Sequence, residues 1–322
     1  MNLMNSRQLK QQAAQRLSNA SYNPRRLALI HAVVILICSL VLTVVDYLLS
    51  VQISGTGGLE GIRTRSILQT AQSVLYLALA VGTPFWDFGF VAASMGYARQ
   101  EEVSPRDLTR GFRWFGPIVR FLLLQVILYI LIALLATQVG SILIAFTPLG
   151  DKTLVLLDAV YQDPQFQQTG VLPDAMLLPL LESMIPVYVV SGVIFAVVAI
   201  PMSYRLRLTR YMIIDGPRPR VLMAMLISRQ IMKGKCWDYF KLDLSFWWYW
   251  LLQVACSVLA YGGVLLAAAG IVLPFDPVVS EFLFYGLNLG ASLLLAWRWR
   301  APVETTYALT YDILTGKIKA EN

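Results

Sequence analysis

The chain has 322 residues, of which 57% are hydrophobic and 14% are charged, and its net charge is +7. This composition is too apolar and too poor in charge for an ordinary soluble domain. The basic residues lie beside apolar segments, so anionic lipid headgroups explain them better than nucleic acid does, and we expect no nucleic-acid partner.

The first 26 residues form a polar, basic arm. Residues 6–18 predict a helix in which Leu9, Ala13 and Leu17 fall on one stripe. We expect this helix to lie on the inner membrane surface or to pack under a helical bundle.

Six apolar segments follow, and a helix of about 20 residues suffices to cross the hydrocarbon of a bilayer. They comprise residues 27–48, 67–90, 117–147, 185–204, 244–272 and 278–297. The first is too long for the core of a signal peptide and is expected to remain as a span. The sequence therefore predicts an all-α integral membrane protein, a six-transmembrane-helix bundle forming one domain over 27–300, followed by a tail over 301–322.

Lys and Arg are concentrated in alternate gaps between these segments. Of the 26, all but Arg63, Arg65 and Lys152 lie at the two termini, in the gaps after the second and fourth segments or, for Arg120, in the first residues of the third segment. Cytoplasmic loops retain Lys and Arg, so both termini are predicted to be cytoplasmic in a multi-pass protein of the cell (cytoplasmic or inner) membrane. Residues 148–184 then form an acidic outer loop, whose scattered acids indicate a solvated face rather than a cation-binding vestibule.

The two long gaps on the basic side contain signals for short interfacial helices. Residues 104–107 (Ser-Pro-Arg-Asp) predict a helix start, and Gly111 predicts its end. In the other gap, residues 215–217 are typical of a turn, a helix begins at Val221, and Gly234 predicts its end.

We call residues 97–120 the first elbow and residues 205–250 the second elbow. Each leads from a basic residue and a glycine into an aromatic and basic cluster. Two independent interfacial turns explain this likeness better than a duplicated half-bundle, although either would produce it. All eight Trp map to the same side as the elbows, whereas aromatic belts ordinarily form at both interfaces. The candidate contacts with lipid or a partner are therefore Arg99, Arg110, Arg113, Trp114, Arg205, Arg207, Arg210, Lys233, Lys235 and Trp237.

Asp87 lies in the second span, three residues after Pro84, where we expect a kink. An intramembrane acid is a functional candidate by default, so Asp87 is a candidate cavity residue, with Arg99 or Arg120 as its partner. His31 is the only histidine. We interpret it as a hydrogen-bonded interfacial residue rather than a proton relay or metal ligand, because the nearby sequence offers no partners.

No motif points to catalysis, a metal or a cofactor. The sequence has no phosphate-binding glycine loop, zinc-protease helix, nucleophile elbow or CxxC pair. Cys38, Cys236 and Cys256 are not spaced as a disulfide framework or a metal site. The protein is therefore not expected to be an enzyme or to carry a cofactor.

Three stretches resemble a family of bacterial multi-pass membrane proteins, domain of unknown function 975. In the first elbow they are residues 96–99, 101–104, 107–108 and 111–112. In the second elbow they are residues 211–215, 228, 232–235, 237, 240, 242 and 244–246, and in the tail residues 306–311. The resemblance implies a membrane-embedded bundle with no assigned activity and no catalytic residues, and it does not extend to 148–184.

These patterns favour a non-enzymatic integral membrane protein whose elbows bind anionic lipid or a protein partner, including a second copy of the chain, in organising the cell envelope. A small-solute transporter or channel component is the alternative, motivated by six spans and by Asp87. An intramembrane lipid enzyme has the weakest support, because His31, Asp87 and scattered serines would have to supply its chemistry.

Overall fold

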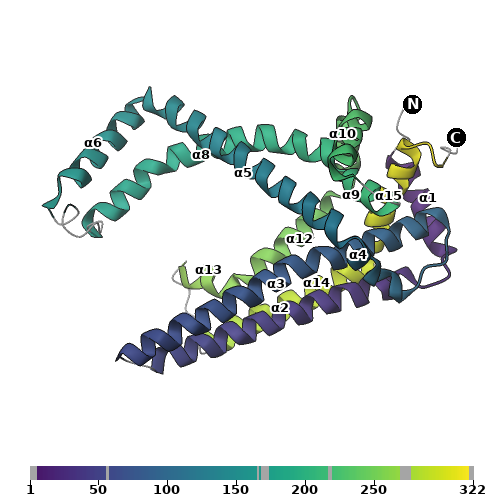
Figure 1. The fold of residues 1–322 in the computed structure, drawn as a ribbon, viewed down its shortest axis with the longest axis horizontal. Coiled ribbons are helices and arrows are strands. Elements are labelled where there is room, and N and C mark those ends of the chain that lie inside the picture. Colours follow the sequence, from purple (N-terminus) through teal and green to yellow (C-terminus); the bar gives the residue numbers. More distant parts are fainter. Residues whose placement is uncertain are drawn as a thin grey trace. The chain divides into compact units, whose positions relative to one another are not determined.

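The computed structural model describes residues 6–55, 58–164, 167, 174–216, 220–268 and 277–318. In these ranges the chain folds into helices and turns, with no strand. The helices divide between two units (Figure 1). Unit 1 comprises Met1–Ile118 and Leu208–Asn322, and unit 2 comprises Val119–Arg207. The all-helical class predicted from the sequence is thus confirmed.

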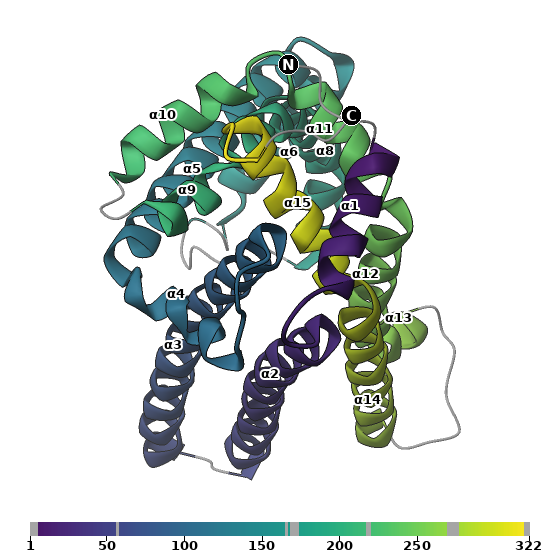
Figure 2. The ribbon, with the colours of Figure 1, turned by 90° about the vertical axis from the view of Figure 1, so that its right-hand side faces the viewer.

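Unit 1 is built around three long helices, and α2 packs against both α3 and α14 (Figures 1 and 2). These helices are α2 (Pro24–Gly55), α3 (Gly58–Arg99) and α14 (Pro277–Leu295). The shorter elements of unit 1 are α1 (Ser6–Ser18), η1 (Pro105–Thr109), α4 (Arg110–Arg113), α9 (Thr209–Asp215), α10 (Val221–Met232), α11 (Cys236–Leu244), α12 (Trp247–Ala260), α13 (Gly262–Ala268), the π-helix η2 (Ala296–Arg300) and α15 (Ala301–Leu314).

Unit 2 consists of most of α5 (Phe115–Ala145), then α6 (Pro148–Gln162) and most of α8 (Asp174–Leu206). Helix α6 packs against α8, and Thr153 donates a hydrogen bond to the Ser183 carbonyl at 3.2 Å. The segment 148–184, expected to be a loop, is therefore largely helical in its described part.

Four helical segments are long and apolar enough to cross a membrane: Pro24–Val45, Ser66–Arg99, Phe115–Ala145 and Leu177–Asp215. A fifth span would require α11 and α12 to act together, and these two helices meet at a bend of 65°. The fifth predicted segment, 244–272, is thus not one continuous helix, because the chain also breaks between α12 and α13. Helix α14 covers the sixth predicted segment, 278–297, except for its last two residues, which belong to η2.

The core of unit 1 lies where the ends of α2 and α3 meet η1 and α15. Its buried residues include Leu27, Phe90, Tyr97, Leu108 and Ala301. Helix α15, which the sequence presents only as part of a tail, packs against α1 and α3 (Figure 2). Every residue from Thr305 to Ile313 is buried.

Two glycines allow the first elbow to lie directly on α3. A Cβ atom on Gly89 would lie 1.8 Å from the carbonyl oxygen of Leu108, and one on Gly111 would lie 1.8 Å from that of Phe85. No side chain fits at such distances, so each glycine permits a backbone contact that fixes η1 and α4 against α3.

Several local predictions are confirmed. Helix α1 has the predicted bounds with Leu9 and Ala13 buried, and the Ser104 amide donates to the Asp107 carboxylate at 2.8 Å as a helix start. The predicted end at Gly111 is wrong, because this glycine lies inside α4, buried against α3. Gly234 does follow α10, with a φ of +77° and open space around it. The glycines of the two elbows therefore serve different purposes.

Candidate functional site

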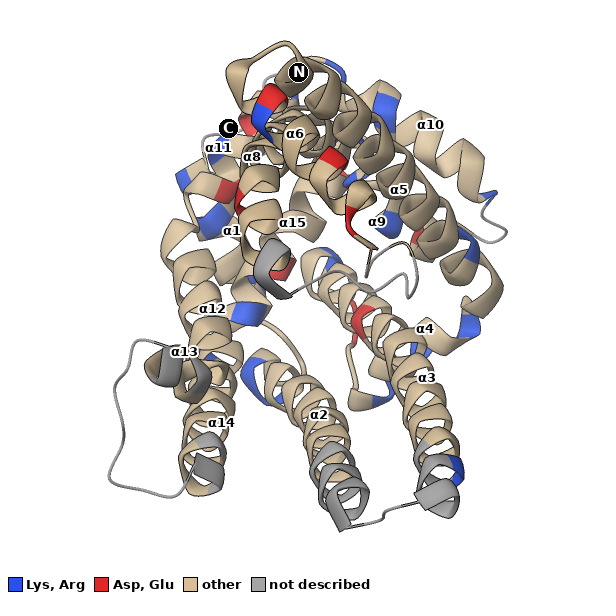
Figure 3. Cartoon of the chain, turned by 90° about the vertical axis from the view of Figure 1, so that its left-hand side faces the viewer, with Lys and Arg blue, Asp and Glu red and all other residues tan. Residues whose placement is uncertain are grey.

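The charged residues of unit 1 lie mostly toward the end of the α2, α3 and α14 bundle where α1, α9 and α15 also lie (Figure 3). Three groups of ion pairs occupy this region, and each includes a side chain from α15 or from the η2 turn that precedes it. We call these groups the Arg99, Arg210 and Arg300 clusters, and together the α15 network.

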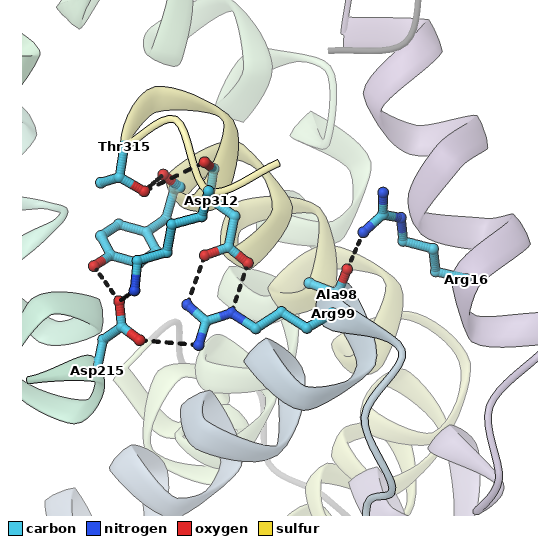
Figure 4. Close-up of polar contacts among 8 residues, drawn as sticks. Arg16, Ala98, Arg99, Asp215, Asp312 and Thr315 are labelled. Atoms are coloured by element: carbon cyan, nitrogen blue, oxygen red, sulfur yellow. Dashed lines mark hydrogen bonds and ion pairs between the residues drawn. The ribbon is translucent and has the colours of Figure 1, made fainter. Parts of the chain in front are cut away.

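The Arg99 cluster joins the ends of α3, α9 and α15 (Figure 4). The Arg99 guanidinium donates to both carboxylate oxygens of Asp312, at 3.0 and 2.7 Å, and to Asp215 at 2.9 Å. The other oxygen of Asp215 accepts from the Tyr311 hydroxyl at 2.8 Å and from Lys317. This arrangement is a bidentate, charge-assisted contact extended to a second carboxylate.

Helix dipoles explain why a cation is needed at this position. The C-terminal end of each helix carries partial negative charge, and α3, α9 and α15 all end near these carboxylates. The Asp312 side chain is completely buried, whereas that of Arg99 is 22% exposed. Arg99 thus offsets two carboxylates and the ends of three helices at once.

The end of α15 is shaped to bring Lys317 back toward α9. Gly316 has a φ of +74°, and the Lys317 amide donates to the Asp312 carbonyl at 2.9 Å. This reversal is a glycine cap of the kind that ends many helices. Burial and the hydrogen bond to Asp215 raise the pKa of Tyr311, so its hydroxyl stays protonated and continues to donate.

The Arg210 cluster lies about two turns earlier along α15. Glu304 accepts hydrogen bonds from the Arg210 guanidinium and from the Tyr211 hydroxyl, each at 2.7 Å. The Tyr211 ring is fully buried and stacks on the Tyr311 ring, with 5.4 Å between centroids. This stacking connects the Arg210 cluster to the Arg99 cluster.

The Arg300 cluster lies where η2 meets α2 and α3. One oxygen of Asp87 lies 2.8 Å from the Arg300 guanidinium and 3.1 Å from Nε2 of the buried His31. Trp86 donates to the His31 carbonyl at 3.2 Å, which fixes α3 to α2 beside the pair. The extra residue of a π-turn is often found at functional positions, and here the π-turn carries Arg300.

The α15 network is electrically balanced. Its cations are Arg99, Arg210, Arg300 and Lys317, and its anions are Asp87, Asp215, Glu304 and Asp312. Because the positive and negative side chains are equal in number, the network has no excess charge that would favour the binding of a free ion. Among the residues that the structure describes, no three His, Cys, Asp or Glu side chains are grouped as metal ligands would be.

The structure divides the predicted contact residues into two groups. Arg99 and Arg210 are engaged by buried or half-buried carboxylates inside unit 1. Most of the others remain at the surface: Arg110, Arg113, Arg205, Lys233 and Trp237 are exposed, and Trp114, Arg207 and Lys235 are half-buried. Arg110 pairs with Asp107 at 2.8 Å, and Trp237 stacks on Phe240 with 5.1 Å between centroids.

The partners expected for Asp87 are wrong. We expected Arg99 or Arg120, but the carboxylate contacts Arg300 and His31, and Arg99 turns to Asp312 instead. His31 does have a charged neighbour, which sequence inspection missed because the two residues lie on different helices. Glu304 and Asp312 were also missed, although residues 211–215 and 306–311 had been singled out by resemblance.

The comparisons with known proteins give one positive result. A family described as "Protein of unknown function (DUF975)" matches residues 1–293. The chain belongs to this family. No curated protein and no solved structure matches it. The match ends before α15, so the DUF975 segment supplies Arg99, Arg210 and Asp215, and the helix beyond it supplies their partners Glu304, Tyr311 and Asp312.

Proposed function

We propose that this DUF975 protein is a non-enzymatic, six-span protein of the cell membrane whose basic and aromatic elbows bind anionic lipid headgroups on the cytoplasmic side. In this proposal both termini are cytoplasmic, and the α15 network holds the elbows in place beneath the bundle. The role is organisational: the protein positions lipid, or a partner that depends on lipid, at the inner face of the envelope.

The span count rests on length, hydropathy and charge. Four helical segments and the bent pair of α11 and α12 could supply five crossings. Helix α14 has 19 residues, and at 1.5 Å per residue such a helix is about 28 Å long, close to the hydrocarbon thickness. The alternation of basic gaps supports six crossings rather than five, because an odd number would place the two basic termini on opposite sides.

Reporter fusions test this topology. We expect fusions after residues 60, 165 and 276 to read as external and fusions after residues 105, 225 and 315 to read as cytoplasmic. An external reading after residue 315 would contradict the six-span arrangement, and an external reading after residue 105 would contradict the orientation.

The observation that carries the lipid proposal is the surface of the first elbow. Arg110 and Arg113 are exposed at the turn where Phe112 and Phe115 are 50% and 55% exposed. Arginine beside exposed aromatic rings suits the headgroup region, since the ring enters the interface and the guanidinium reaches phosphate. Arg110 also pairs with Asp107, but its side chain is 57% exposed. Those of Arg99 and Arg210 are only 22% and 30% exposed beside their carboxylates, and we assign these two to the network rather than to lipid.

Lipid binding can be tested on the purified full-length protein. Native mass spectrometry should show retention of phosphatidylglycerol over phosphatidylcholine, with the preference reduced about 30-fold in the Arg110→Ala/Arg113→Ala variant, since each of the two basic residues contributes about 1 kcal/mol near an anionic surface. The matched control is Arg63→Ala/Lys152→Ala, which removes two exposed cations from the predicted outer side. Equal losses in both variants, or no preference in the parent protein, would contradict the proposal.

A transporter remains the second candidate, because the Asp87 side chain is 49% exposed although it belongs to an apolar span. A half-exposed carboxylate held by Arg300 and His31 is suited to line a solute path. If proteoliposomes take up a solute above the protein-free background, the Asp87→Asn variant should change that flux. Unchanged flux would remove Asp87 from any transport mechanism.

A further inference from the structure

Helix α10 presents an apolar face that nothing in unit 1 covers. One side of the helix is buried, where it packs against α9, and includes Val221, Ala224 and Met232. The opposite side carries four exposed apolar residues. They are Leu222 (63% exposed), Met223 (53%), Leu226 (59%) and Ile227 (43%).

Basic residues border this face on both sides. At 3.6 residues per turn, Arg220 and Arg229 fall on opposite flanks of the exposed apolar stripe, and both side chains are exposed. Exposed Lys233 follows at the end of the helix, and Trp237 (64% exposed) begins the next one. An apolar stripe between two basic flanks, followed by tryptophan, matches the chemistry of a lipid surface with phosphate above acyl chains.

The length of α10 determines how it can meet a bilayer. Its 12 residues make a helix of about 18 Å, too short for the roughly 30 Å of hydrocarbon. An apolar helix of this length therefore lies along a membrane surface rather than across it. The φ of +77° at Gly234 then turns the chain directly into α11.

We propose that α10 is an in-plane membrane helix that inserts Leu222, Met223, Leu226 and Ile227 among the acyl chains of an anionic leaflet. The side of the membrane and the class of lipid rest on the function proposed above. The insertion itself rests on the exposed stripe, its basic flanks and its length. The elbow thus contacts lipid in two ways, with headgroups at Arg220 and Arg229 and with acyl chains between them.

Site-directed spin labelling in nanodiscs tests the insertion on the full-length chain. A background with Cys38→Ala, Cys236→Ser and Cys256→Ala would receive single labels at Leu226→Cys and, as a water-exposed reference, Glu102→Cys, whose parent side chain is exposed. We expect the label at 226 to collide with oxygen and to be shielded from an aqueous nickel complex. The label at 102 should show the reverse.

Two outcomes would overturn the insertion. A label at 226 as open to nickel as the label at 102 would place the stripe in water. A label at 226 shielded from both reagents would place it against protein, such as a second copy of the chain. A measurement without substitutions is also available: a phospholipid with a diazirine on its acyl chain should label residues 221–232 of the parent protein, and no labelling there would contradict insertion.

The lipid composition separates this inference from the proposed function. The same labels can be measured in phosphatidylglycerol and in phosphatidylcholine nanodiscs, beside the retention assay on Arg110 and Arg113. Retained phosphatidylglycerol preference without insertion at 226 overturns the α10 inference alone. Insertion at 226 without any preference for phosphatidylglycerol overturns the anionic-lipid function and leaves α10 as an interfacial helix.

Discussion

Replacing Arg99 with Leu should destabilise unit 1 strongly, because it leaves the Asp312 carboxylate buried without a cation. Asp312 would lose contacts of 3.0 and 2.7 Å, and its side chain has no exposure to water. Removing one partner of a buried ion pair costs about 3–5 kcal/mol. Asp215 keeps Tyr311 and Lys317, so we expect the lower end, about 3 kcal/mol.

The assay is thermal unfolding of the purified protein in a mild detergent, followed by tryptophan fluorescence. The matched control is Lys241→Leu, which breaks an ion pair with Asp238 that is 3.8 Å long and exposed on both sides. Exposed pairs of this type contribute about 0–1 kcal/mol, so the control should change the midpoint little.

A double variant removes both members of the buried pair. In Arg99→Leu/Asp312→Leu the buried charge is gone, and apolar side chains often replace a buried pair at little cost. We therefore expect the double variant to unfold at a higher temperature than Arg99→Leu alone. Two results would refute this reasoning. Either Arg99→Leu lowers the unfolding midpoint no more than Lys241→Leu does, or the effects of Arg99→Leu and Asp312→Leu on stability are additive in the double variant.

Two further predictions concern the helix contacts around the network. Gly111→Ala should lower the free energy of unfolding by roughly 1–3 kcal/mol, because the new Cβ would overlap the Phe85 carbonyl. The control is Gly116→Ala, where the space around the Cβ is open. This control should be neutral or slightly stabilising in the same thermal assay. Asp87→Asn should lower the free energy of unfolding by about 1–2 kcal/mol. This is the contribution of a charge-assisted hydrogen bond, reduced because the Asp87 side chain is partly exposed to solvent. The double variant with Arg300→Gln should cost less than the sum of the two singles, and strict additivity would show that this pair is not coupled.

Local features of the fold could be predicted from the sequence because their causes are local. The bounds of α1 follow from its composition and periodicity, and the helix start at Ser104 follows from a short capping motif. Gly234 was predicted as a helix end for the reason the structure shows, a backbone conformation that favours glycine. In each case the determining residues are neighbours in the chain.

The α15 network could not be predicted in the same way, since its pairs join distant segments. Arg99 and Asp312 are separated by 213 residues, as are Asp87 and Arg300, and Arg210 and Glu304 by 94. A sequence shows which residues can carry charge, but the packing of α3, α9 and α15 decides which of them meet. The expected pairing of Asp87 with Arg99 failed because it considered only nearby cations.

Helix α15 was underestimated for a related physical reason. Glu304 and Asp312 interrupt its apolar run, so hydropathy places the segment outside the membrane and suggests a solvated tail. In the structure Asp312 is buried and Glu304 half-buried, each beside an arginine. Tyr307 and Tyr311 stack on Tyr239 and Tyr211, and helix α15 packs against α1 and α3. Apolar periodicity alone does not detect a helix buried through its ion pairs.

The buried network also changes what the charge asymmetry of this chain means for lipid. Four of the basic residues on the predicted cytoplasmic side (Arg99, Arg210, Arg300 and Lys317) are matched by four carboxylates inside unit 1. Because they cancel in equal number, the net charge of +7 is carried by the remaining side chains. Those include the exposed side chains of Arg113 in the first elbow and of Arg220 and Arg229 beside α10, whereas Arg110 is exposed but shares its charge with the buried Asp107. Variants that distinguish the two groups should therefore separate folding from lipid recognition: loss of Arg99 lowers stability, and loss of Arg113 lowers lipid preference in a protein that remains folded.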